Sequence, residues 1–299
     1  MSAVLGGTGR PDWDRDGGDW PNRAASQFVE AAGMRWHVQR MGQGPCVLLL
    51  HGTGAATHSW RDLMPLLAER CSVLAPDLPG HGFTAMPPPH GLTLPGMAGA
   101  LAGLLAALQA APVLAVGHSA GAAILARMCL DGSLAPRRLI SLNGAFLPFR
   151  GLPGRVLAPM ARLAARGTLL PRLIAWRADD PDYTGRLVRG TGSTLDARGL
   201  ALYRRLACRP GHVAAALGMM ARWDLAALVR ELRHLRPPLT LVVGANDHAI
   251  RPAEARKVMA LVPDATLVRL PGLGHLAHEE RPAQVARIIL DALPTDCFN

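Results

Sequence analysis

The sequence predicts an α/β protein with a mostly parallel, twisted sheet, helices on both faces of the sheet, and a helical lid insertion. Three observations lead to this prediction. Short, continuously apolar runs alternate with helical patterns, as expected for parallel strands covered on both faces. One of these runs enters a Gly-x-Ser-x-Gly turn that opens directly into a helix. The segment 146–223 interrupts the alternation with helical patterns that are dotted with Gly and Pro.

The chain begins with a segment unlike the rest. Residues 1–26 are rich in Gly, Asp, Trp and Pro, so we expect an extended N-terminal arm. Two short runs joined by Ala32-Gly33 then predict an antiparallel hairpin over 28–31 and 34–38. The predicted core covers 27–145 and 224–295, and its buried strands are expected at 46–50, 72–77, 113–118, 138–143, 239–243 and 265–270.

Helices are expected between these strands, and one of them lies in an unusual stretch. No Asp, Glu, Lys or Arg occurs from Leu78 to Ala126. Pro and Gln residues interrupt this stretch, and its apolar part falls short of the ~20 residues that span a bilayer. We therefore predict a buried helix over about 96–110 and no membrane span. One further helix is predicted to end near Glu69, and three more are predicted over 122–130, 252–261 and 281–293.

Charge is concentrated in the predicted lid. The 299-residue chain has a net charge of +10, and 146–223 alone carries thirteen Arg and four Asp, a net charge of +9. A solvated lid face is one interpretation. The other is contact with an anionic amphiphile or an anionic membrane surface. No nucleic-acid-binding motif or aromatic stacking pattern accompanies the charge, so we expect no nucleic-acid partner.

Cysteine usage and the N-terminus bear on location. Five cysteines form no Cys-x-x-Cys pair and several lie in apolar runs, which indicates reduced thiols in a reducing compartment. The charged N-terminus lacks the apolar core of a signal peptide. We therefore expect a cytoplasmic protein, peripheral to the inner membrane if the lid contacts lipid.

The stretch 113–121 carries the strongest chemical signal. Five small or apolar residues lead into Gly117-His118-Ser119-Ala120-Gly121. A side chain at either glycine would collide with the chain as it doubles back. Such a turn lifts the Ser119 hydroxyl above the sheet edge and brings the Ala120 N–H close to it. The alternative is a tight strand-to-helix turn whose Ser merely caps a helix.

Three further polar residues follow predicted strands. Asp247, His275 and Thr53 come after the strands at 239–243, 265–270 and 46–50, where ligands meet an open α/β sheet. The order Ser, Asp, His matches a catalytic triad built on a nucleophile elbow. We predict that His275 takes the proton of Ser119 and that Asp247 orients the imidazole. The N–H groups of Thr53 and Ala120 are the predicted oxyanion hole.

Other interpretations of these residues are weaker. His278 is a rival base, but a metal site around it would lack a third ligand at a useful spacing. Gly52-x-Gly54 with Asp77 at the next strand end is similar to a dinucleotide fingerprint. Thr57, however, stands where a third Gly or Ala belongs, and Ser119 would remain unexplained. We therefore predict no cofactor and no metal.

These motifs resemble the α/β-hydrolase fold family across about residues 28–293. The resemblance implies a serine hydrolase that cleaves an ester or related acyl bond. A carboxylate nucleophile, as in the haloalkane and epoxide branches of the fold, does not fit Ser119. The matching motifs are His51-Gly52, Asp77-Leu78-Pro79-Gly80-His81-Gly82, Gly117-His118-Ser119-Ala120-Gly121, Asp247 and Gly274-His275.

Two segments, 19–29 and 52–62, carry a narrower likeness. They resemble the hydrolase-like proteins of bacteriochlorophyll gene clusters that are described as magnesium-chelatase accessory proteins. This implies a photosynthetic bacterium and a role near magnesium insertion into protoporphyrin, with contact to magnesium chelatase. An apolar pocket under the Arg-rich lid would suit a small hydrophobic or anionic amphiphilic substrate, of which a tetrapyrrole is one candidate. The alternative is a non-catalytic protein that binds porphyrin and delivers it to the chelatase.

Overall fold

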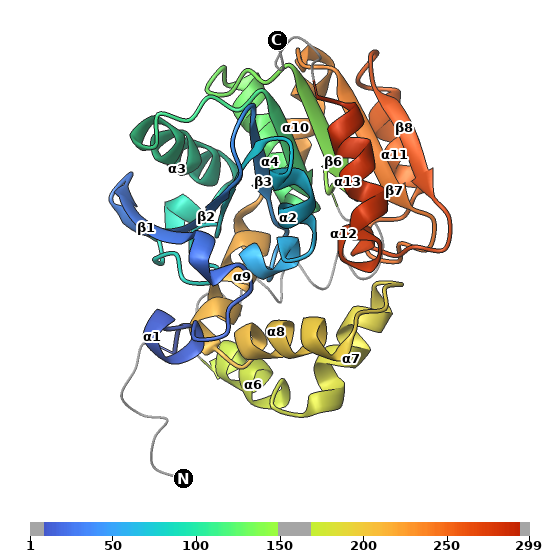
Figure 1. Ribbon diagram of the computed structural model, residues 1–299. Helices are drawn as coiled ribbons and strands as arrows, with labels where there is room; N and C mark the ends of the chain where they lie inside the picture. Colours follow the sequence, from blue (N-terminus) through green and yellow to red (C-terminus); the bar gives the residue numbers. More distant parts are fainter. Residues whose placement is uncertain (1–8, 149–168, 294–299) are drawn as a thin grey trace.

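The computed structural model describes residues 9–148 and 169–293, and within them one eight-stranded sheet forms the centre of the molecule (Figure 1). The strand order is β1-β2-β4-β3-β5-β6-β7-β8. The strands are β1 (Ser26–Ala31), β2 (Met34–Met41), β3 (Cys46–Leu50), β4 (Ser72–Pro76), β5 (Leu114–His118), β6 (Arg138–Leu142), β7 (Leu239–Gly244) and β8 (Thr266–Leu270).

The pairing confirms the predicted sheet. β2 is antiparallel to both β1 and β4, while the strands from β4 across to β8 all run parallel. The central strands are buried on both faces, which explains why their sequences are continuously apolar rather than alternating. The carboxyl ends of these strands consequently meet at one edge of the sheet, where the predicted polar residues follow them.

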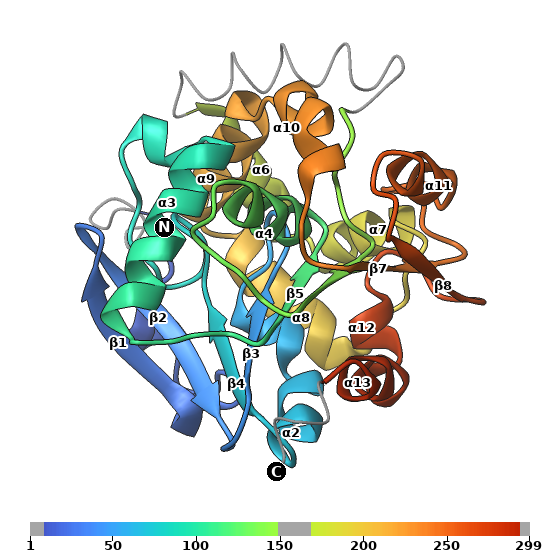
Figure 2. The same cartoon turned by 90° about the horizontal axis from the view of Figure 1, so that it is seen from above.

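Helices cover both faces of the sheet (Figure 2). One face packs against α2 (Leu63–Ala68) and α13 (Pro282–Asp291), beside the short α12 (Ala277–Glu280) and the 3-10 turn η2 (Thr57–Trp60). The other face packs against α3 (Leu94–Ala107), α4 (Ala120–Leu130), α10 (Leu225–Glu231) and α11 (Ala253–Met259), with the turns η3 (Pro89–Leu92) and η4 (Leu232–His234). The uncharged stretch thus forms a buried helix and strand, as predicted.

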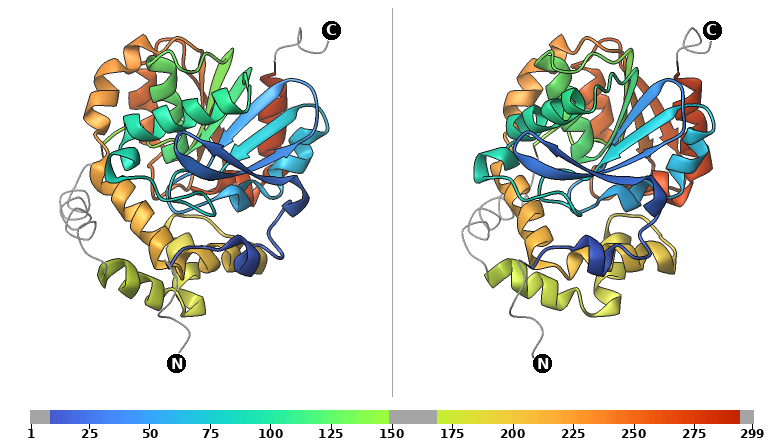
Figure 3. Two further views of the ribbon diagram at one scale, coloured as in Figure 1. Left: turned by 90° about the vertical axis from the view of Figure 1, so that its left-hand side faces the viewer. Right: turned by 60° about the vertical axis from the view of Figure 1, so that its left-hand side comes forward.

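Four helices form a separate layer below the carboxyl ends of the strands (Figure 3). They are α6 (Leu169–Arg177), α7 (Pro181–Gly190), α8 (Ala197–Ala207) and α9 (Pro210–Arg222). All lie within the segment predicted as the lid, of which 149–168 is outside the described residues. In the described part of the chain no single helix is long and apolar enough to cross a membrane. α9 and the Leu225–His234 segment reach that length and composition only as a pair bent by 54°.

The N-terminal arm differs from the extended segment that we expected. Residues 13–16 form the short helix α1 (Trp13–Asp16), which Asp12 caps, and η1 (Arg23–Ala25) precedes β1. The buried indole of Trp20 donates a hydrogen bond to Thr57 Oγ1 at 3.0 Å. Asp19 pairs with Arg205 of α8. Aromatic burial and these polar contacts fold the arm against both the core and the lid.

Four of the five cysteines lie in the described part of the chain. Cys46, Cys71, Cys129 and Cys208 are free, while Cys297 lies outside the described residues. Burial raises the pKa of Cys71 to about 11 and that of Cys129 to about 12. These two thiols are therefore core residues with little thiolate at neutral pH.

Candidate active site

Ser119 occupies the sharp turn between β5 and α4. Its backbone angles are φ 49° and ψ −115°, a conformation that costs a residue with a side chain on the order of 1–3 kcal/mol. A Cβ on Gly117 would lie 2.4 Å from the Ala122 nitrogen, and one on Gly121 would lie 2.2 Å from the Leu50 oxygen. The two glycines thus allow the turn, as predicted. Ser119 forms no side-chain cap on α4 within the described chain, so capping does not account for it.

Asp247 and His275 lie together beyond the carboxyl ends of β7 and β8. His275 Nδ1 and Asp247 Oδ2 are 2.8 Å apart. The Asp247 side chain is fully buried, and its other oxygen, Oδ1, accepts hydrogen bonds from the N–H groups of Ala249 and Ile250, each at 2.8 Å. The loop therefore fixes the carboxylate, and the carboxylate in turn fixes the imidazole.

Asn143 also holds this carboxylate, although no motif in the sequence marks it. It follows β6, adopts a left-handed φ of 49°, and donates from Nδ2 to Asp247 Oδ2 at 2.6 Å. Asp247 Oδ2 is thus shared by the amide of Asn143 and the imidazole of His275. Only its position could have indicated this role, because Asn143 directly follows β6, the strand that lies between those of Ser119 and Asp247.

His118 links the turn of Ser119 to the loop of His275. Its Nε2–H donates to the backbone oxygen of His275 at 3.0 Å. Its ring packs against the rings of His275 and His278, with centroids 4.7 and 4.5 Å away. Burial, followed by the neighbouring His278 and His275, lowers the pKa of His118 well below its ordinary value. A neutral His118 therefore sets the separation between the two loops.

A cavity of about 330 Å³ lies between the strand ends and the lid. Ser119, His275 and Thr53 all line it. Its remaining lining carries no Lys, Arg, Asp or Glu among the described residues and consists of Gly54, Ala55, His118, Ile174, Thr184, Leu187, Val188, Thr191, Tyr203, Ala207, His212, Val213, Ala216, Leu217 and Leu276. A larger hollow of about 660 Å³, beside Arg137 and Arg138 at the amino ends of β6 and β7, contains none of the candidate site residues.

The loop of Thr53 and the first residue of α4, Ala120, are both next to Ser119. A Cβ on Gly52, the neighbour of Thr53, would approach Ser119 Cβ to 2.9 Å, so the two loops are in close contact. Ala120 is the first residue of α4, where N–H groups have no acceptor within the helix. In the described part of the chain, neither the Thr53 nor the Ala120 N–H donates to a protein acceptor. Thr53 also lines the cavity, whereas Ala120 is buried directly beside Ser119 in the chain.

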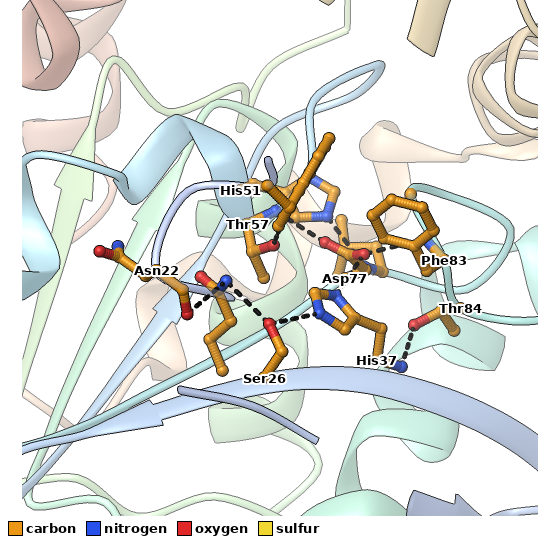
Figure 4. Close-up of polar contacts among 12 residues, drawn as sticks. Asn22, Ser26, His37, His51, Thr57, Asp77, Phe83 and Thr84 are labelled. Carbon is orange, nitrogen blue, oxygen red and sulfur yellow. Dashed lines mark hydrogen bonds and ion pairs between the residues drawn. The ribbon is translucent and has the colours of Figure 1, made fainter. Parts of the chain in front are cut away.

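Asp77 anchors the loop that carries Thr53 (Figure 4). Its buried carboxylate accepts from the N–H groups of Thr57 and Phe83, at 2.7 and 2.9 Å, and contacts His37 Nδ1 at 2.8 Å. Burial acts to raise the pKa of Asp77, but the neighbouring His37 and these hydrogen bonds lower it overall. The carboxylate of Asp77 thus forms its hydrogen bonds within the protein and does not serve as a ribose ligand.

His212 of α9 connects the lid to the same loop. Its Nδ1 accepts from the Gly82 N–H at 3.1 Å, so the proton is on Nε2, which donates to the Gly54 oxygen at 3.0 Å. Burial lowers the pKa of His212 to about 4. No motif marks His212 in the sequence, and only the packing of α9 reveals its position.

We expect His212 to make the stability of the protein depend on pH. Between about pH 4 and 6.5 the unfolded chain binds a proton at this residue and the folded chain does not. The stabilisation is complete above pH 6.5 and falls by up to ~3 kcal/mol as the pH drops to 4. Urea unfolding of the parent and of His212→Gln across this range measures the effect. Equal pH slopes for the two proteins would contradict the assignment.

His278, the rival base, does not line the cavity. It is buried between Trp60 and His118, and its Nε2 is 2.8 Å from Ser59 Oγ. Burial lowers its pKa to about 3. Among the residues that the structure describes, no group of three His, Cys, Asp or Glu is arranged to hold a metal ion. His278 therefore acts as packing behind the site.

Comparison with known proteins agrees with this geometry. A model of the alpha/beta hydrolase family matches residues 47–288. The chain belongs to the α/β-hydrolase family. A solved structure of a putative α/β hydrolase from Nostoc superposes on this chain with a TM-score of 0.76 and 22% sequence identity. The superposition covers 90% of this chain and 98% of the Nostoc protein. The predicted fold is thereby confirmed.

Two relatives are similar over most of the chain. The magnesium-chelatase 30 kDa subunit of Rhodobacter capsulatus is 36% identical over 92% of this chain and 96% of its own length. The pimeloyl-[acyl-carrier protein] methyl ester esterase of Aromatoleum aromaticum is 30% identical over 83% and 98%. The resemblance to the chelatase-associated proteins is thereby confirmed as well.

Proposed function

We propose that this protein is a serine hydrolase that cleaves an ester or related acyl bond with Ser119, His275 and Asp247. One observation carries the proposal. Ser119 is held in a strained turn on a cavity that it shares with His275, whose Nδ1 contacts the buried carboxylate of Asp247. A hydroxyl needs an adjacent base to become a nucleophile, and the base needs an orienting group.

The reaction that follows from these roles has two stages. His275 Nε2 takes the Ser119 proton as Oγ attacks the acyl carbon, and Asp247 stabilises the imidazolium. The tetrahedral intermediate collapses to an acyl-enzyme when His275 returns the proton to the leaving group. Water then attacks the acyl-enzyme by the same route and releases the acid.

The oxyanion of each intermediate needs donors already in place. We assign the N–H groups of Thr53 and Ala120 to this role. The loop of Thr53 contacts Ser119, Ala120 follows Ser119 directly, and neither N–H group has a protein acceptor among the described residues. One such donor is typically worth ~3–4 kcal/mol of the barrier. The contacts of Asp77 and His212 hold the loop of Thr53 in position.

The cavity indicates the class of substrate. Its described lining is neutral and largely apolar, which favours an uncharged, hydrophobic acyl or alcohol group of modest size over an anionic one. The relative named as a magnesium-chelatase subunit supports an association with that enzyme. We therefore place the reaction in bacteriochlorophyll synthesis, with a direct contact to the chelatase.

Labelling with a fluorophosphonate tests the catalytic proposal. We expect one covalent adduct on the parent protein, because a triad-activated serine attacks the phosphorus. Ser119→Ala should acquire none. Intact mass measures both, and Ser133→Ala, which removes a hydroxyl just beyond the C-terminal end of α4, should label like the parent.

The absence of an adduct on folded parent protein would overturn the proposal. That result would favour the non-catalytic alternative, a porphyrin-binding accessory protein. Titration with protoporphyrin would then be the next measurement. The described cavity offers no cation to the propionates of a porphyrin, so we expect no tight complex within it.

A further inference from the structure

The outer helix of the lid exposes a row of large apolar side chains. On α6, Leu169, Leu173 and Trp176 are 78%, 54% and 69% exposed. Side chains of this size on a protein surface are usually scattered singly, whereas these three recur at the i, i+4, i+7 spacing of one helix face. The row therefore requires an explanation other than ordinary surface composition.

The row has positive charge on both sides. At about 100° per residue, Leu169, Leu173 and Trp176 fall within an arc of roughly 60°, and Arg172 and Arg177 lie about 40° beyond its two edges. We call these five residues the outer face of α6. Both arginines are exposed, and in the described part of the chain neither forms an ion pair.

The opposite side of α6 packs against the rest of the protein. Pro171 and Ala175 are buried, and Ile174 lines the cavity beside Ser119. Figure 3 shows α6 as the outermost helix of the lid, on the side away from the sheet. The helix is thus fixed with its apolar row outward, and rotation cannot hide the row.

We propose that the outer face of α6 docks on an anionic lipid surface. Leucine and tryptophan suit the boundary between headgroups and acyl chains, and flanking arginines pair with lipid phosphates. A protein partner would also cover apolar side chains, and tryptophan and arginine are both common at protein interfaces. The arrangement on α6 favours lipid instead, because one arginine lies at each edge of the apolar row, where the phosphates of the headgroups would meet it. The charge complementarity therefore favours the membrane.

Docking would also affect access to the cavity. Ile174 of α6 lines the cavity, and Leu187 of α7 lines it while remaining 53% exposed. An apolar substrate could therefore pass from the bilayer to Ser119 over a short path. This consequence rests on the proposed hydrolase function, whereas the membrane contact does not.

Cosedimentation with vesicles tests the membrane contact directly. We expect the full-length parent to bind vesicles of phosphatidylcholine mixed with phosphatidylglycerol, and to bind phosphatidylcholine alone much more weakly. Replacing Leu169, Leu173 and Trp176 together with serine should weaken binding about 100-fold. Arg172→Gln with Arg177→Gln should weaken it about 25-fold, roughly five-fold for each arginine.

A charge-matched variant distinguishes docking from general attraction. Arg251→Gln with Arg256→Gln removes the same charge from exposed positions at and near α11, and should change binding by less than about two-fold. Thermal unfolding checks that every variant is folded. The proposal fails if the parent does not bind anionic vesicles, or if the α6 variants bind them as well as the parent does. It also fails if the only effect of the α6 substitutions is to abolish self-association of the chain. Fluorophosphonate labelling in the absence of lipid is independent of all these outcomes.

Discussion

Asp247→Asn will slow the reaction of Ser119 with a fluorophosphonate about 10⁴-fold without unfolding the protein. The reason lies in the two oxygens of Asp247. Oδ1 accepts two backbone N–H groups, so an asparagine keeps its single carbonyl oxygen there. Its NH₂ group then takes the place of Oδ2 and faces His275 Nδ1. The imidazole must accept at Nδ1, its proton moves to Nε2, and it can no longer take the proton of Ser119.

Asn143→Gly should slow the same labelling reaction less than Asp247→Asn does. It removes one hydrogen bond to Asp247 Oδ2, and glycine tolerates the left-handed φ of this position. We expect a loss of about ten-fold, because the carboxylate itself remains. Labelling followed over time by mass spectrometry gives the rate for each of the two variants and for the parent. An Asp247→Asn protein that labels within ten-fold of the parent would remove Asp247 from its assigned role.

The strands and the residues at their ends could be predicted because they are local signals in chain order. Each buried strand is a short apolar run, and parallel strands place whatever follows them at one edge. Ser119, Asp247 and His275 were found in this way, although their roles remain a proposal. The hairpin of β1 and β2 was equally local, since its turn at Ala32-Gly33 carries the signal.

The supporting contacts could not be predicted, because they join residues far apart in sequence. His212 and Gly54 are 158 residues apart, and Asn143 and Asp247 are 104 apart. No spacing rule connects such pairs. The arm was misjudged for the same reason: its composition suggests an extended chain, but the burial of Trp20 against Thr57 decides its structure.

The charge of the lid can be read from the sequence, but its orientation cannot. The excess of arginine over acidic residues is plain in the sequence, and contact with an anionic partner stays one interpretation of it. The sequence did not show which side of the helix at 169–177 would face outward. That depends on Pro171, Ala175 and Ile174 packing inward, which leaves the apolar row exposed.

Asp77→Ala is expected to lower the free energy of unfolding by about 3–5 kcal/mol. The side chain is fully buried, and its loss leaves two backbone N–H groups and His37 without their acceptor. The stabilisation exists above the ordinary pKa of an aspartate, about 4, and is lost as the pH falls below that value, because Asp77 has a lowered pKa in the folded protein. Urea unfolding at neutral pH measures the difference.

Asp131→Ala is the matched control for this change. Asp131 pairs with Arg127 at 2.7 Å, but its side chain is 43% exposed, so its removal should cost less than about 1 kcal/mol. Because Asp77 holds Thr57, four residues after Thr53, any Asp77→Ala protein that remains folded should also label more slowly at Ser119. Equal stabilities of the two variants would show that the buried carboxylate is not the anchor of the Thr53 loop.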